Sequence, residues 1–192
     1  MESTYKTEFE KVIELFCSIC GELCIPYFIG GSVASGVRSE FRATNDVDIV
    51  CDFRNVDVTR FIVLCQNEFY ADEVSIPKLI ADKSSFNIIH KMSFVKIDVF
   101  TKLSVLEESE FNRANAILQV GSRIKAKVAT SEYIILAKLR WWKNSNGILS
   151  RQLEDIAKVV LCNKDFLDFV YLKEMAGKIA LLDELEKILL FS

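Results

Sequence analysis

Three aspartates and a glycine-rich turn are the residues of this sequence whose types and spacing suit chemistry. Asp46 and Asp48 are two positions apart in an alternating segment, so both carboxylates leave the same side of a strand. Asp98 is a third acid, in the middle of the apolar strand segment FVKIDVF. If the two strands are neighbours, the three carboxylates converge on one site.

A cluster of Asp46, Asp48 and Asp98 calls for a cation. Carboxylates so close together repel, and the pKa of one of them rises unless a positive ion lies between them. Clustered oxygen ligands bind hard cations, so we expect these three aspartates to hold Mg²⁺ or Mn²⁺. Paired metal ions stabilise both the attacking and the leaving oxygen in phosphoryl transfer. The acids therefore predict a metal-dependent transfer site.

The turn Gly30-Gly31-Ser32 predicts a phosphate-binding site beside the acids. Its glycines let the backbone approach a ligand and adopt a positive φ, and Ser32 adds a hydroxyl. The following helix offers free N–H groups and its positive dipole end to an anion. The turn would hold a triphosphate while the acids hold its metal ions.

The composition limits the class of protein. The chain has 192 residues, of which 51% are hydrophobic, and a formal net charge of -3. This favours a well-packed core and argues against a protein coated in basic residues, though not against a local basic cleft. The charged, amphipathic N-terminus is unlike a signal peptide, and no apolar run has transmembrane length, so we expect a cytoplasmic protein without a membrane partner.

The cysteines then predict reduced thiols. Cys17, Cys20 and Cys24 stand at i, i+3 and i+7, which suits either a metal site or one buried helix face. We favour the buried face, because no fourth ligand stands at zinc-finger spacing.

Hydrophobic periodicity predicts an α/β fold: a small mixed-sheet domain with flanking helices over residues 1–128, and a helical C-terminal domain over 129–192. The expected strands are 27–29, 46–52, 86–90, 94–100 and 124–128, the last at a sheet edge. The expected helices are 5–24, 33–37, 57–69, 132–143, 150–162, 165–177 and 179–191, with Asp165 as an N-cap.

These motifs, in this order, resemble the nucleotidyltransferase superfamily built on the polymerase-beta-like palm. The matching residues are Gly30-Gly31-Ser32, Asp46-Val47-Asp48 and Asp98. The segment RATNDVD at 42–48 and the helical segments at 136–142 and 150–156 are similar to small bacterial members, some of which accompany toxin–antitoxin or abortive-infection modules. The resemblance spans about residues 26 to 160.

The resemblance implies a role for each matching residue. Gly30, Gly31 and Ser32 would bind the nucleotide phosphates. Asp46, Asp48 and Asp98 would be both the metal ligands and the catalytic residues, and Asp98 would activate the acceptor hydroxyl.

Three further residues are candidates for nucleotide binding. Arg42 would either contact phosphate or brace the strand, and for Thr44 we favour bracing. Lys138 would either reach a phosphate or be a solvated helix charge, which we favour. Arg151 and Asp155 would either pair at i, i+4 or face the cleft.

The sequence allows two interpretations for a pair of adjacent tryptophans and two for a basic strand face. Trp141 and Trp142 would either stack on a base or pack in the interior, which we favour. Arg123, Lys125 and Lys127 alternate on one face of a strand, where they would either guide a nucleic-acid backbone or protect a sheet edge.

The function predicted is transfer of a nucleoside monophosphate from a nucleoside triphosphate to an acceptor hydroxyl, with release of pyrophosphate. RNA, a protein or a small molecule would all suit as acceptor, and a protein partner or a homodimer is compatible with the sequence. The alternative is a catalytically silent palm that acts as a toxin–antitoxin or regulatory partner. An exposed apolar patch on the last helix, at Leu181, Leu182, Leu185, Leu189 and Phe191, would favour that alternative.

Overall fold

The computed structural model describes residues 8–39, 44–114, 116–120, 124–148 and 150–191. The strands are β1 (Tyr27–Ile29), β2 (Asp46–Cys51), β3 (Phe69–Tyr70), β4 (Ser85–His90), β5 (Lys96–Phe100), β6 (Ala116–Val120) and β7 (Ile124–Val128). The helices are α1 (Glu8–Glu22), α2 (Gly31–Arg38), α3 (Val58–Glu68), α4 (Ser75–Ala81), α5 (Val105–Arg113), α6 (Ser131–Asn144), α7 (Ser150–Asn163), α8 (Phe169–Lys178) and α9 (Leu182–Phe191).

The described strands form one mixed sheet of seven strands in the order β3-β4-β5-β2-β1-β7-β6. β1 is antiparallel to β2 and parallel to β7, while β2 is parallel to β5. This sheet and its flanking helices confirm the predicted α/β class. The short strand β3, the helices α4 and α5 and the strand β6 were absent from the prediction.

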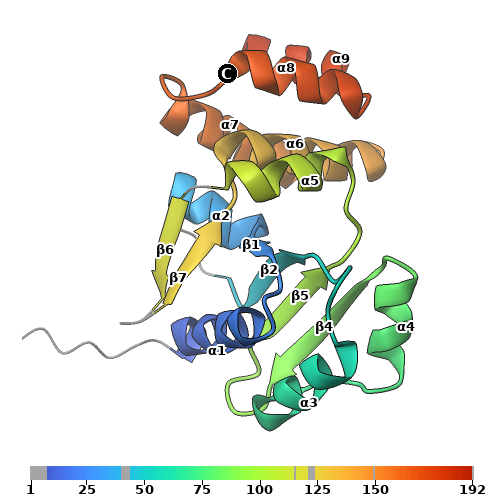
Figure 1. Ribbon diagram of the computed structural model, residues 1–192. Helices are drawn as coiled ribbons and strands as arrows, with labels where there is room; N and C mark the ends of the chain where they lie inside the picture. The colour runs from blue at the N-terminus through green and yellow to red at the C-terminus, as the bar shows by residue number, and fades with distance from the viewer. Residues whose placement is uncertain (1–7, 40–43, 115, 121–123, 149, 192) are drawn as a thin grey trace, which may run out of the picture.

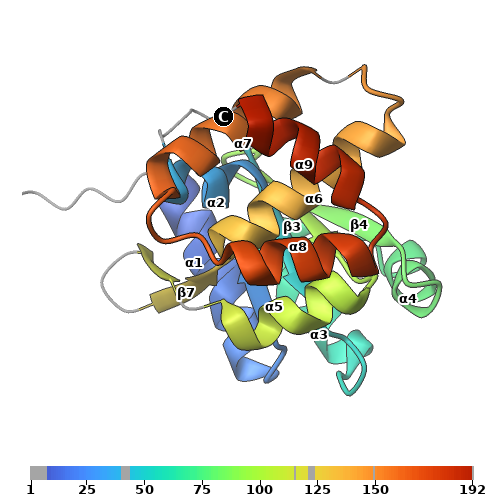
Figure 2. The ribbon, with the colours of Figure 1, turned by 90° about the horizontal axis from the view of Figure 1, so that it is seen from above.

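Helices cover the sheet on both sides (Figure 1). On one side, α1 and α3 pack together through Phe16 and Phe61, whose ring centroids are 6.2 Å apart. On the other side, Phe28 of β1 contacts Phe111 of α5 and Tyr133 of α6. Beyond these two helices, α8 and α9 form the outermost layer, as both views show (Figures 1 and 2).

Side-chain caps set the starts of the helices that carry or support the candidate site. Ser104 and Glu107 form a capping box at the start of α5, and Thr130 caps α6 by accepting a hydrogen bond from the N–H of Tyr133. Asp168 caps α8 in the same way. The prediction of Asp165 as this cap was wrong, because Phe166 and Leu167 still belong to the turn that follows α7.

The exposed apolar patch that would favour the catalytically silent alternative is not present among the described side chains of that set. Leu181 and Leu185 are buried, and Leu182 and Leu189 pack against the core. The side chain of Phe191 lies outside the described residues. Helix α9 packs onto α8 and α6, and this packing buries the apolar face of α9.

The prediction that the cysteine spacing marks a buried helix face is confirmed for Cys17 and Cys20, but it was wrong for Cys24, which follows the end of α1 and is exposed. Cys17 and Cys20 are buried in the layer between α1 and the sheet, and Cys51 of β2 and Cys65 of α3 are buried there too. Burial raises the pKa of the Cys17 thiol to about 12, so it stays protonated at neutral pH. These residues act as small apolar groups.

The predicted division near residue 128 falls at the end of β7. A single hydrophobic core cluster includes residues from both sides of that position, such as Ile29 and Ile135. The assignment of two domains stays a prediction. Among the described residues, no helix combines the length and apolar character that crossing a membrane requires.

Candidate active site

The glycine turn packs directly against the carboxylate of Asp48. The backbone N–H of Gly30 donates a hydrogen bond of 2.9 Å to the carbonyl oxygen of Asp48. Gly31 has a φ of +53°, and a Cβ there would lie 1.7 Å from Oδ2 of Asp48. A side chain is therefore excluded twice, by the left-handed backbone and by the contact. The backbone N–H of Ser32 donates to the same carboxylate.

The three aspartates lie on one face of two adjacent strands. β2 and β5 run parallel, and their register pairs Asp48 with Asp98 and Asp46 with Lys96. Side chains at paired positions leave the same face of a sheet. The condition on which the predicted cluster depended, adjacency of the two strands, is therefore met.

Burial separates Asp48 electrostatically from the other two acids. Burial raises the pKa of Asp48, and the Asp98 carboxylate raises it further, while the N–H of Ser32 partly opposes both. The side chain of Asp46 is 53% exposed and that of Asp98 is 24% exposed. The negative charge of Asp48 is therefore disfavoured at the point where the turn meets the strand.

Lys96 supplies a positive charge that the sequence analysis did not single out. Its Nζ lies 2.8 Å from Oδ2 of Asp98 and 3.8 Å from Oδ2 of Asp46. The hydrogen bond to Asp98 is the main cause of the raised pKa of Lys96. A signal was available, because Lys96 stands two residues before Asp98 in an alternating strand and must share its face.

The residues present fit a hard divalent cation, although their side chains do not already surround a site. Among the described residues, no three His, Cys, Asp or Glu side chains stand together as a ready ligand set. However, Asp46, Asp48 and Asp98 offer carboxylate oxygens on one face, and the ammonium of Lys96 lies between two of them. Carboxylate oxygens are the ligands that such a cation prefers, and the ammonium shows that a positive charge fits between two of them.

Lys138 faces this sheet from α6. The prediction of a solvated charge was wrong, because Lys138 is 7% exposed. Its Nζ donates a hydrogen bond of 2.6 Å to Oδ2 of Asp155 on α7, and its charge partly stabilises the Asp48 carboxylate. Asp155 therefore pairs with Lys138, while Arg151 is exposed.

A second ion pair joins α5 to α6. Arg140 donates hydrogen bonds to Oε1 of Glu107 and, at 3.2 Å, to Oγ of Ser104. The hydroxyl of Tyr133 also donates to Glu107, at 3.3 Å. Burial alone would raise the pKa of Glu107, but the interactions with Arg140 and Ser104 outweigh it and the pKa is lowered. Glu107 was missed because α5 itself was not predicted.

A cleft of about 820 Å³ lies between these two sets of residues. One wall, the palm wall, carries the glycine turn and Asp48, and the other, the helical wall, carries Lys138, Arg140 and Trp141. Trp141 is 55% exposed, so the prediction of interior packing was wrong for it. Trp142 does pack against the core. The exposed indole of Trp141 is available to stack on a ligand.

The remaining two candidates have different outcomes. Thr44 braces the start of β2, because its hydroxyl donates to the carbonyl oxygen of Asp46 at 3.1 Å and accepts from the Asp46 N–H at 3.3 Å. This agrees with the role that we favoured. Arg42 lies outside the described residues.

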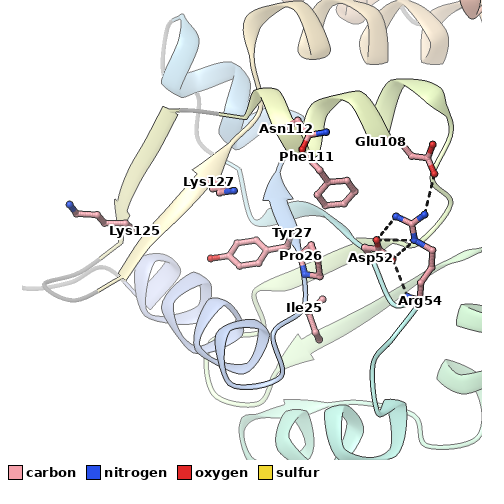
Figure 3. A pocket seen from close by; sticks show the side chains of 10 residues that line it. All are labelled: Ile25, Pro26, Tyr27, Asp52, Arg54, Glu108, Phe111, Asn112, Lys125 and Lys127. Atoms are coloured by element: carbon pink, nitrogen blue, oxygen red, sulfur yellow. Dashed lines mark hydrogen bonds and ion pairs between the residues drawn. The ribbon is translucent and has the colours of Figure 1, made fainter.

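A second hollow, of about 740 Å³, lies at the other end of β2 (Figure 3). Arg54 borders it but is neutralised by Asp52 and by Glu108. Lys127 points into the hollow from β7, and Lys125 points away from it (Figure 3).

The expectation that β7 is an edge strand was wrong. β7 is paired with β1 on one side and with β6 on the other, so its lysines do not protect an edge. Arg123 lies outside the described residues. A role of Lys125 and Lys127 in contacting nucleic acid stays a prediction.

No family model and no curated protein matches this sequence. Solved structures do share its fold. The solution structure of the antibiotic-resistance factor ANT(2'')-Ia matches with a TM-score of 0.55 and 12% identity, over 93% of this chain and 96% of that one. A crystal structure of ANT(2'')-Ia with adenylyl-2''-tobramycin has a TM-score of 0.52 and 13% identity, over 81% and 89%.

A third similar structure is an antigenic nucleotidyltransferase-like protein from Paracoccidioides brasiliensis. It has a TM-score of 0.53 and 18% identity, over 80% of this chain and 75% of that one. These similarities show that the chain has the nucleotidyltransferase fold, as the sequence motifs predicted.

Proposed function

We propose that this nucleotidyltransferase-fold chain transfers a nucleoside monophosphate from a nucleoside triphosphate to an acceptor hydroxyl and releases pyrophosphate. One observation carries the proposal. The turn at Gly31 leaves no room for a side chain against Asp48, and Asp48 is in register with Asp98 on the neighbouring strand. A turn that binds phosphate and acids that bind its metal ion need this closeness.

The residues around the turn would bind and orient the triphosphate. Gly30, Gly31 and Ser32 would present backbone N–H groups and the Ser32 hydroxyl to the phosphates at the start of α2. Lys138 would add a positive charge from the helical wall, since it already lies in the cleft opposite Asp48. Thr44 would keep Asp46 in place through its hydrogen bonds to the backbone of β2.

The acids would hold the metal and manage the proton. Asp46, Asp48 and Asp98 would bind Mg²⁺ or Mn²⁺, which neutralises charge on the attacking and leaving oxygens. Asp98 would accept the proton of the acceptor hydroxyl as its oxygen bonds to the α-phosphorus. The bond between the α-phosphorus and the bridging oxygen breaks, and pyrophosphate leaves with that electron pair. Positioning and charge would contribute most of the rate.

The exposed face of Trp141 supports a planar ligand in the cleft. Its indole lies on the same wall as Lys138, so a base stacked there would leave its phosphates near the turn.

A label-transfer experiment tests the function. The protein would be incubated with Mn²⁺ or Mg²⁺ and each α-labelled nucleoside triphosphate, in separate reactions with total RNA, a protein extract and a panel of hydroxylated antibiotics. Asp46→Ala/Asp48→Ala would serve as the inactive variant. Asp52→Asn is the matched control, because it removes a carboxylate that directly follows the same strand and lines the other hollow.

Label on one acceptor class, absent with the double variant and present with Asp52→Asn, is the expected result. If label transfers equally with the double variant, the acids are not catalytic. If nothing transfers and nucleotide with Mg²⁺ does not raise the Tm, the silent binding module becomes the better interpretation. In that case the chain would act through a partner, such as a toxin–antitoxin component.

A further inference from the structure

Lys96 occupies the place on the sheet where a cation is needed. It lies on β5 opposite Asp46 and two residues before Asp98, so all three side chains share one face. Its Nζ is 2.8 Å from Asp98 and 3.8 Å from Asp46. The ammonium therefore contacts one oxygen of each acid.

Within the described residues, Lys96 is the cation that forms an ion pair with either acid. Lys138 forms its ion pair with Asp155, and Asp48 receives a hydrogen bond from the N–H of Ser32. The side chain of Lys96 is 35% exposed, so solvent reaches it and it is free to leave. A surface lysine without an electrostatic role would not need to lie between two acids of one cluster.

We infer that Lys96 is a built-in counter-ion that competes with the divalent cation for Asp46 and Asp98. The inference rests on the proposed function, because it assumes that these acids bind the metal. Without metal, the ammonium offsets the repulsion among the three carboxylates. When metal binds, Lys96 must withdraw, and the lost ion pairs lower the apparent metal affinity.

Metal affinity without nucleotide is the measurement that isolates this effect. Free Mn²⁺ would be followed by electron paramagnetic resonance in titrations of the wild type, Lys96→Met and Lys96→Arg. Lys102→Met is the matched control, since Lys102 lines the cleft just after β5 but has no ion pair among the described residues. Lys96→Gln replaces Lys96→Met if the latter does not fold.

Lys96→Met is expected to bind Mn²⁺ about tenfold more tightly than the wild type, the equivalent of about 1.4 kcal/mol. Lys96→Arg keeps the charge and should bind like the wild type. Lys102→Met should change the affinity by less than about twofold, because the charge that it removes is exposed and screened.

Thermal unfolding gives a second readout that a merely structural role would not produce. In EDTA, Lys96→Met should melt below the wild type, because the carboxylates have lost their cation. In saturating Mn²⁺ this difference should vanish or reverse. A lysine that only packs would lower the Tm equally in both conditions.

The outcomes separate the inference from the proposed function. If the wild type binds Mn²⁺ and Lys96→Met binds it no more tightly, the competition is refuted while the metal site stands. If none of the proteins binds Mn²⁺, including the wild type, both the inference and the metal-dependent function are overturned.

Discussion

The two walls of the cleft differ in how far their charged side chains are paired with opposite charges. On the palm wall, Asp48 lines the cleft and shares a sheet face with Asp46 and Asp98, whose ion-pair partner is Lys96. On the helical wall, Lys138 is matched by Asp155 and Arg140 by Glu107. The palm wall therefore keeps an excess of negative charge for a ligand, whereas the pairs of the helical wall hold its helices in position.

The walls also differ in how their parts are brought together. The palm wall depends on backbone hydrogen bonding between the turn and the strand, in which the N–H of Gly30 donates to the carbonyl oxygen of Asp48. The helical wall depends instead on side-chain ion pairs between helices, Arg140 with Glu107 and Lys138 with Asp155. Substitutions should therefore affect function on the palm wall and stability on the helical wall.

The largest effect is expected from Gly31→Ala. The added Cβ would overlap Oδ2 of Asp48 and strain the backbone, displacing the carboxylate or the turn by an ångström or more. We expect transfer activity to fall by more than about 100-fold. Gly177→Ala is the control, because nothing lies within 4 Å of a Cβ there and the residue is within α8. It should leave activity unchanged, and wild-type activity in Gly31→Ala would refute the close packing.

Asp48→Asn should separate activity from stability. Loss of one metal ligand should lower kcat by about 100-fold or more. The unfolding free energy should not fall, because a neutral side chain removes a charge that burial and Asp98 disfavour. Steady-state transfer rates and urea unfolding measure the two quantities. If Asp48→Asn lowered the unfolding free energy but kept its activity, the palm wall would serve stability and not function.

Glu107→Gln should act on stability instead. It leaves Arg140, which is two-thirds buried, without its counter-charge, and we expect a loss of roughly 2 to 3 kcal/mol. Glu108→Gln is the matched control, since its pair with Arg54 is exposed and worth less than about 0.5 kcal/mol. Chemical denaturation of both variants measures the contrast. Equal losses of unfolding free energy in the two variants would show that burial does not make the ion pair of the helical wall stronger than the exposed one.

The smallest predicted effect on stability comes from Glu110, and it depends on pH. It is buried on α5 and accepts hydrogen bonds from the N–H and hydroxyl of Thr130 at the start of α6. Burial raises its pKa to about 7. The folded protein therefore binds a proton that the unfolded chain has lost, so stability falls as the pH rises through this range.

Between pH 5.5 and 7.5 the loss assigned to Glu110 is about 1 to 2 kcal/mol. Glu110→Gln should remove that part of the slope, which the difference between the two proteins isolates in Tm or denaturant midpoints. An identical slope in wild type and variant would show that Glu110 does not titrate there.

The sequence alone determined most of the palm wall. Alternation placed Asp46 and Asp48 on one strand face, and Gly30-Gly31-Ser32 marked a turn that needs glycine, because both signals come from residues close together in the chain. The same local signals predicted the central strands β1, β2, β4 and β5 to within two residues.

Only the tertiary structure decided the helical wall and the counter-ion. Three features depend on how α5, α6 and α7 pack, and no local sequence pattern predicts them. They are the burial of Lys138, its pairing with Asp155 and the ion pair of Arg140 with Glu107. The interior position of β7 and the pairing of Lys96 with Asp46 depend on strand order and register. Local periodicity shows which face a side chain takes, but only folding shows what lies opposite that face.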